Sequence, residues 1–151
     1  MAEVLAGAGH EVVASDLHDH GYGTVGIDLL ACQTMLSGCR SLVTNPPYGD
    51  ASPTPGQRRA PTALLEFLRH TLALTKTVDG QLALLVRLQW IAGKRAAALL
   101  SEAPLTATVI LTKRIQWFDM GAETKPAQHH HAWILFDYQK PADTPPALFF
   151  A

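Results

Sequence analysis

Four consecutive residues, Asn45-Pro46-Pro47-Tyr48, bring an amide, two stiff prolines and an aromatic ring together at one point of the 151-residue chain. They follow the apolar run 41–44, which has the composition of a short strand. Two prolines end a strand and hold the nearby backbone carbonyls in a fixed direction. Carbonyl and amide oxygens accept hydrogen bonds from a planar amino group, and an aromatic ring stacks on a flat one. The pattern therefore predicts a binding site for a flat group that carries an amine. The simpler interpretation of the same residues is a Pro-Pro turn with a surface tyrosine.

Two carboxylates stand at comparable places earlier in the chain. Asp16 ends a predicted strand over 11–15, and Asp28 ends a weaker one over 24–27. In an open parallel sheet, ligands bind beyond the carboxyl ends of the strands. We therefore expect Asp16, Asp28 and Asn45–Tyr48 to line one rim of the sheet, although either Asp taken alone is more typical of a turn or a helix cap.

Helical and strand patterns alternate through most of the chain, which predicts an α/β fold with a parallel sheet covered on both faces. We expect helices at 1–6, 62–76 and 94–102, strands at 41–44, 81–86, 108–111 and 132–136, and a brief helix or loop at 29–38. The last two strands are expected to pair antiparallel, because the segment between them is polar and shows no helical period. One domain over 1–140 followed by a Pro-rich tail at 141–151 is the predicted organisation.

Composition narrows the class of protein. The chain is 48% hydrophobic with a formal net charge of -1, so it is globular and carries no dominant basic patch for tight non-specific binding to nucleic acid. Cys32 and Cys39 are its only cysteines and fit neither a disulfide scaffold nor a metal motif. No apolar run is long enough to span a membrane. We expect a cytoplasmic protein without a membrane partner.

With Asn-Pro-Pro-Tyr at a strand end and two acidic strand ends before it, the chain resembles the S-adenosylmethionine-dependent amino-methyltransferases. The adenine-N6 DNA methyltransferases are the most similar. The resemblance implies a Rossmann-like methyltransferase fold with a C-terminal antiparallel hairpin, and S-adenosylmethionine as cofactor. It further implies that Asp16 holds the ribose hydroxyls of the cofactor, that Asp28 accepts from its adenine amino group, and that Leu29 packs on the adenine face.

The resemblance also assigns roles to the tetrapeptide. Asn45 and the carbonyl of Pro46 would accept hydrogen bonds from the target amine and steer its nitrogen toward the methyl group, so Asn45 borders the cofactor as well. Pro47 would keep the turn stiff, and Tyr48 would stack on a base flipped out of its helix. DNA is the expected partner. RNA guanine or protein glutamine stay open as acceptors, because enzymes acting on them share the tetrapeptide.

One departure from the family pattern concerns the N-terminal part. The family has a first strand and a glycine-rich, cofactor-binding loop before its first helix, and neither precedes the helix predicted at 1–6. We therefore expect a sheet that lacks its first strand, and an N-terminally truncated chain or a start codon assigned too late. The cofactor would then bind poorly. The alternative is an inactive remnant that serves as a binding or assembly module, with a homo-oligomer covering the open sheet.

Several other residues invite a role. Trp90 follows the strand at 81–86 and could wall a substrate pocket or simply pack, and Trp117 lies in a loop suited to contact a displaced nucleotide. Arg87 suits either a phosphate contact or a solvated ion pair. Neighbouring residues of a strand face opposite ways, so the run 129–131 of three histidines cannot converge on one ion, and no metal site is expected.

Overall fold

The computed structural model describes residues 1–36, 38–48, 63–116, 129–141 and 143–151. The chain divides into two compact units, residues 1–39 and residues 40–151, which are described separately. In the part of the chain that the structure describes, no helix is both long and apolar enough to cross a bilayer.

The first unit is small and locally built. Its elements are α1 (Ala2–Gly7), β1 (Ser15–Asp16), β2 (Thr24–Val25) and the 3-10 helix η1 (Leu29–Ala31). β1 and β2 pair in parallel as a two-stranded sheet, with Ser15 opposite Thr24. Gly23, at φ +82°, brings its backbone so close to Ala14 that a Cβ there would stand 2.5 Å from the Ala14 carbonyl oxygen. Only glycine fits that approach.

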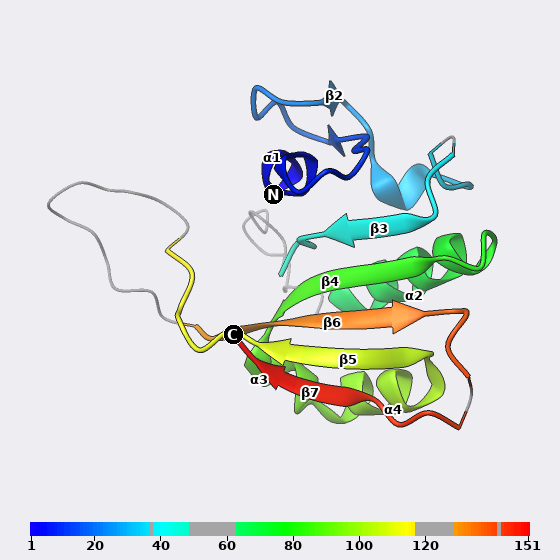
Figure 1. The fold of residues 1–151 in the computed structure, drawn as a ribbon, viewed down its shortest axis with the longest axis vertical. Coiled ribbons are helices and arrows are strands. Elements are labelled where there is room, and N and C mark those ends of the chain that lie inside the picture. Colours follow the sequence, from blue (N-terminus) through cyan, green and yellow to red (C-terminus); the bar gives the residue numbers. More distant parts are fainter. Residues whose placement is uncertain (37, 49–62, 117–128, 142) are drawn as a thin grey trace, which may run out of the picture. The chain divides into compact units, whose positions relative to one another are not determined.

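The second unit contains a five-stranded sheet in the order β3-β4-β6-β5-β7 (Figure 1). Its strands are β3 (Ser41–Thr44), β4 (Gln81–Arg87), β5 (Leu105–Ile110), β6 (His131–Asp137) and β7 (Ala147–Phe150). β3 is parallel to β4, and β5 is parallel to β7. β6 lies antiparallel between β4 and β5, so it alone runs against the other four strands.

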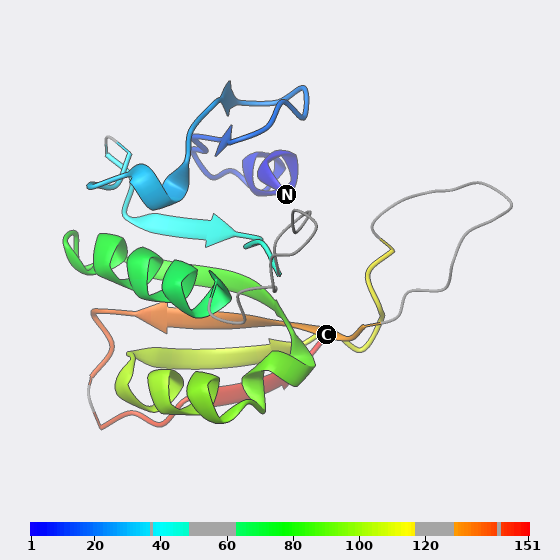
Figure 2. The ribbon, with the colours of Figure 1, turned by 180° about the vertical axis from the view of Figure 1, so that it is seen from behind.

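Three helices cover one face of this sheet: α2 (Ala63–Lys76), α3 (Leu88–Ile91) and α4 (Lys94–Glu102). They lie behind the sheet in Figure 1 and in front of it in Figure 2. Apolar side chains spaced three or four residues apart on α2 pack against the alternate residues of β4 and β6 that face it. The fully buried side chains at this interface include Leu68, Leu82, Leu84, Ile134 and Phe136.

The α/β class and the antiparallel pairing of β5 with β6 are confirmed. β1 and β2 form a sheet of their own, and the absence of a first strand stays a prediction. Two expectations need correction. Within the second unit the described helices cover one face of the sheet, not both. The segment 141–151 is not all tail, because Ala147–Phe150 pair with β5. A single domain over 1–140 stays a prediction.

Candidate active site

The tetrapeptide stands where the sequence places it, directly after β3. Because β3 and β4 are parallel, it shares the carboxyl edge of the sheet with Arg87, the last residue of β4. Pro46 is buried, Asn45 and Pro47 are exposed, and Tyr48 is half-buried. The turn is therefore anchored through one proline, while the amide stays accessible to a ligand.

Tyr48 is the most connected residue of this turn. Its hydroxyl oxygen lies 2.7 Å from Oδ1 of Asn45 and 3.0 Å from the carbonyl oxygen of Leu85. The guanidinium carbon of Arg87 stands 5.2 Å from the centre of its ring, a cation–π distance. The ring of His131 lies 5.7 Å away, centre to centre, at 52°. These contacts fix the ring beside the exposed amide.

Burial tunes two ionisable groups of this cluster. It raises the pKa of Tyr48 to about 12, and the positive charge of Arg87 opposes that shift only in part. Tyr48 therefore keeps its proton at neutral pH and remains a hydrogen-bond donor. Burial also lowers the pKa of His131, and Arg87 adds to that shift. The imidazole of His131 is neutral at pH 7.

The partners of Tyr48 are what sequence reasoning missed. The sequence suits Arg87 to a phosphate contact or a solvated ion pair; the structure places its side chain half-buried over the ring of Tyr48, and the phosphate contact stays a prediction. Its Nε is buried and has no hydrogen-bond partner among the described residues. For His131 the sequence suggests only a role as a metal ligand. Pro46 is the one residue whose type could have indicated the bond to Leu85. A proline at a strand edge has no N–H, so the carbonyl that faces it on the next strand needs another donor.

The histidine run and the two tryptophans have different outcomes. Nε of Arg114 donates to Nε2 of His130 at 3.1 Å, and no group of three His, Cys, Asp or Glu side chains in the described ranges is placed to hold a metal ion.

Trp90 is half-buried in α3, which follows β4 at the same edge of the sheet as Asn45. Trp117 lies outside the described residues. Substrate roles for both tryptophans stay predictions.

In the first unit, Asp16 is the last residue of β1, and Asp28 stands three residues after the end of its parallel partner β2. Oδ1 of Asp16 accepts from the amide of His18 at 2.9 Å and lies 3.7 Å from Nε2 of His20. Oδ1 of Asp28 accepts from the amide of Leu30 at 3.0 Å and so caps η1. Both carboxylates thus make the local bonds of turn and cap residues.

The same two carboxylates suit the hydroxyl and amino donors of a nucleoside. Both are exposed, and Oδ2 of each has no hydrogen-bond partner within the part of the chain that is described. Leu29, half-buried next to Asp28, offers an apolar surface to a flat ring. The residues therefore fit an adenosine group, and a common rim with Asn45 stays a prediction.

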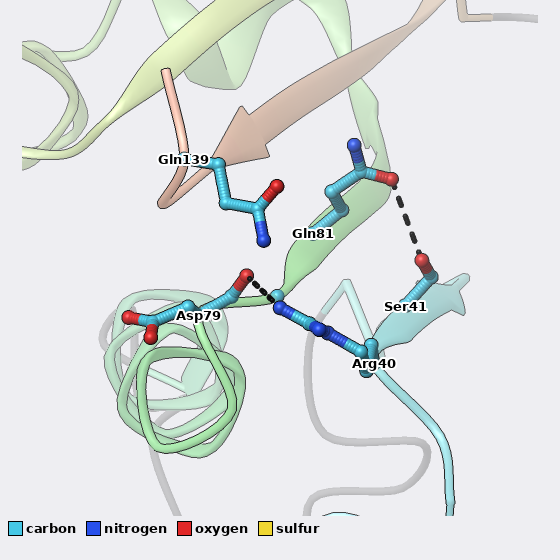
Figure 3. A pocket seen from close by; sticks show the side chains of 6 residues that line it. Arg40, Ser41, Asp79, Gln81 and Gln139 are labelled. Carbon is cyan, nitrogen blue, oxygen red and sulfur yellow. Dashed lines mark hydrogen bonds between the residues drawn. The ribbon is translucent and has the colours of Figure 1, made fainter. Parts of the chain in front are cut away.

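A polar hollow of about 280 Å³ lies elsewhere in the second unit, lined by Arg40, Ser41, Asp79, Gly80, Gln81 and Gln139. Figure 3 shows Arg40 donating to the Asp79 carbonyl and Ser41 donating to the side chain of Gln81. It sits at the amino ends of β3 and β4, opposite the carboxyl edge at which ligands of such sheets bind. We therefore place the candidate site at Asn45–Tyr48.

Comparisons with known proteins bear on the fold. No protein-family model and no curated protein matches the chain. The fold is similar to that of a Listeria monocytogenes protein provisionally described as a class I S-adenosylmethionine-dependent methyltransferase, with a TM-score of 0.57 and 13% identity over 99% of this chain. The match spans 52% of that protein, about half its length. The fold is therefore of the class I methyltransferase type.

A second solved structure, M1.HpyAVI in complex with S-adenosylmethionine, aligns with 74% of this chain and 56% of its own length. The identity is 14% and the TM-score 0.32, so this likeness carries no argument.

Proposed function

We propose that this chain transfers a methyl group from S-adenosylmethionine to an exocyclic amino group, with adenine N6 in DNA as the acceptor. One observation carries the proposal. An exposed Asn45 amide follows β3 directly, beside a proline turn anchored by buried Pro46, in a fold of the class I methyltransferase type. Amide and carbonyl oxygens held at a strand end are acceptors suited to the two hydrogens of a planar amine.

The chemistry asks for positioning more than for a base. Asn45 Oδ1 and the Pro46 carbonyl accept the two amine hydrogens and so direct the nitrogen lone pair out of the base plane. When bound, S-adenosylmethionine would supply a methyl group on a positively charged sulfur. As the amine nitrogen takes the methyl group, the carbon–sulfur bond breaks, the sulfur leaves as a neutral thioether, and the surplus proton of the amine passes to solvent. Holding the two reactants in line and stabilising charge on the amine account for the acceleration.

Charge at the site favours nucleic acid over a protein acceptor. Arg87 ends β4 and stands over Tyr48, and Arg114 follows β5 and bonds to His130. These side chains lie at the same edge of the sheet as Asn45, because β4 and β5 run in one direction. A phosphodiester next to the target base would meet this positive edge, whereas a glutamine side chain brings no such charge. The base itself would stack on Tyr48.

Cofactor binding is assigned to the first unit. Asp16 would accept from ribose hydroxyls and Asp28 from the adenine amino group, with Leu29 against the ring. Titration calorimetry with S-adenosylmethionine tests this. We expect Asp16→Ala and Asp28→Ala each to weaken binding about tenfold, the loss of one charge-assisted hydrogen bond. Asp19→Ala is the matched control, because Asp19 also accepts from a backbone amide two residues on and is not a strand end.

Turnover is tested by methyl transfer to three acceptors: unmethylated DNA, RNA and a glutamine-containing protein. We expect transfer to DNA, and a loss of about 10²-fold or more in Asn45→Ala, the size seen when one oriented polar group is removed from a transition state. Gln89→Ala is the control, because Gln89 is an exposed amide on α3 at the same edge. Transfer to RNA or protein alone would replace the substrate assignment, and equal loss in both variants would contradict the role of Asn45.

A second function, a non-catalytic binding or assembly module, is favoured by one observation. None of the described side chains of residues 1–39 is buried, so the proposed cofactor unit has no core of its own. Absence of saturable binding in the calorimetric titration would support the module and contradict the transferase.

A further inference from the structure

The ladder between β3 and β4 is interrupted by Pro46. The register pairs Ser41 with Gln81 and Thr44 with Leu84, and the amide of Gln81 donates to the carbonyl of Arg40 at 2.9 Å. In a parallel ladder every second residue of one strand bonds to its partner strand in this way. Continuing the pattern, the carbonyl of Leu85 faces the backbone nitrogen of residue 46. That residue is proline and has no N–H to give.

Tyr48 supplies the missing donor. Leu85 is 4% exposed, and a buried carbonyl at such a place needs a partner. The hydroxyl oxygen of Tyr48 lies 3.0 Å from this carbonyl oxygen. The side chain of Tyr48 therefore folds back onto β4 and replaces a backbone hydrogen bond that the proline turn removes.

The hydrogen bond from Tyr48 to Leu85 decides which group is the donor in the contact between Tyr48 and Asn45. A tyrosine hydroxyl has one proton, and Tyr48 stands within hydrogen-bonding distance of two oxygens, that of Leu85 and Oδ1 of Asn45 at 2.7 Å. Donating to Asn45 would leave the buried Leu85 carbonyl without a donor. Turning the amide of Asn45 by 180° costs less, because Asn45 is exposed and an amide has the same shape either way.

We propose that Tyr48 is a positioning residue, whose hydroxyl donates to the Leu85 carbonyl, accepts from Nδ2 of Asn45, and thereby turns Oδ1 of Asn45 toward the target amine. The proposal rests on the proposed function, since it specifies how the amine acceptor is oriented. It gives the hydroxyl group of Tyr48 a task separate from stacking by its ring. Pro46 is the origin of this arrangement. Because Pro46 has no N–H for the Leu85 carbonyl, the hydroxyl proton of Tyr48 is used there and is not available to Asn45.

The first test does not need activity. In ¹⁵N-labelled protein the side-chain NH₂ signal of Asn45 is identified by its absence from the spectrum of Asn45→Asp. We expect two well-separated proton shifts for this group and a nuclear Overhauser contact to the ring of Tyr48. In Tyr48→Phe the two shifts should converge on those of a solvated asparagine and the contact should vanish.

Tyr138→Phe is the matched control. The hydroxyl of Tyr138 also donates to a backbone carbonyl, that of Leu72, at 3.0 Å and in a half-buried place. Its removal costs the fold a similar bond but should leave the signal of Asn45 unchanged. An Asn45 amide that is solvated in the wild type, or one that Tyr48→Phe leaves unchanged, would overturn the proposal.

The second test is a double-mutant cycle in the methyl-transfer assay. Tyr48→Phe should lower kcat about tenfold, the value of one hydrogen bond, with little change in KM because the ring is kept. In the Asn45→Asp background the same change should have no further effect, since a carboxylate presents an acceptor oxygen in either orientation. The same tenfold loss in both backgrounds would show a merely structural tyrosine and overturn the proposal. Absence of transfer by the wild type on all three acceptors would instead overturn the proposed function, and the spectra would then decide the role of Tyr48.

Discussion

The two units differ most in how many apolar side chains each of them buries. In residues 40–151 a sheet and the helices on its face bury a continuous set of apolar side chains, several of them completely. In residues 1–39 no described side chain is buried, and Val4, Val13, Leu17 and Val25 are between 48% and 75% exposed. A two-stranded sheet of two-residue strands is too small to be stable alone.

The candidate functional residues follow the same division. Asp16 and Asp28 make hydrogen bonds to backbone amides two residues away. Tyr48 instead bonds across 37 residues to Leu85, a buried residue of β4. The proposed amine-binding turn is thus held by tertiary structure, whereas the proposed cofactor residues rest on local turns. We expect the second unit to be preorganised and the first to gain most from a ligand.

Amide hydrogen exchange should show the largest difference. Amides of β4 and β6 are central in the sheet and should exchange about 10³-fold or more slowly than amides in β1 and β2, which have no buried side chains. Adding S-adenosylmethionine should slow exchange chiefly in the first unit. Similar protection of both units without ligand would contradict the expectation that only the second unit is preorganised.

Core truncation should separate the units nearly as sharply. Leu68→Ala removes a completely buried side chain and should lower the free energy of unfolding by about 2–5 kcal/mol in urea titrations. Val25→Ala changes a side chain that is 48% exposed and should stay within about 0.5 kcal/mol. A large loss from Val25→Ala would mean that the first unit packs into the cooperative core.

The pH dependence of stability should come from the second unit. Because burial lowers the pKa of His131, the folded state binds its proton less tightly than the unfolded state. The stabilisation is therefore present above the ordinary histidine pKa of about 6.5 and is lost as the pH falls through the lowered value. Thermal unfolding between these limits should show a weaker pH dependence in His131→Gln, and a profile parallel to that of the wild type would contradict this origin.

The smallest effect should come from the cap of η1. Asp28→Ala removes the acceptor of the Leu30 amide, and such a cap is worth about 0.5–1 kcal/mol. The loss should appear as faster exchange of that amide, with urea unfolding of the second unit unchanged. Asp28→Asn retains a capping oxygen and should restore the slower exchange. A fall in global stability as large as that of Leu68→Ala would show one cooperative unit.

Sequence patterns predicted the locally encoded elements well. The helix expected at 94–102 is α4 with the same bounds, and the strand expected at 81–86 is β4 with one residue more. The strand is a near-continuous apolar run, and the helix is rich in the strong helix formers Ala and Leu. β7 was missed, because Ala147–Phe150 follows a Pro-rich stretch and its partner, β5, is distant in the chain. β1 is shorter than the run of apolar residues predicts, since little packs against it.

Residue types alone determined that an amide, two prolines and a tyrosine would end a strand, and hence that amine acceptors would be presented there. Only the tertiary structure decided where the tyrosine goes. The missing N–H of Pro46 matters because the register sets it against Leu85, and register depends on pairing between segments that no local pattern links. Residue types therefore determine which hydrogen-bond acceptors are present at the strand end, and non-local strand pairing determines which groups surround them.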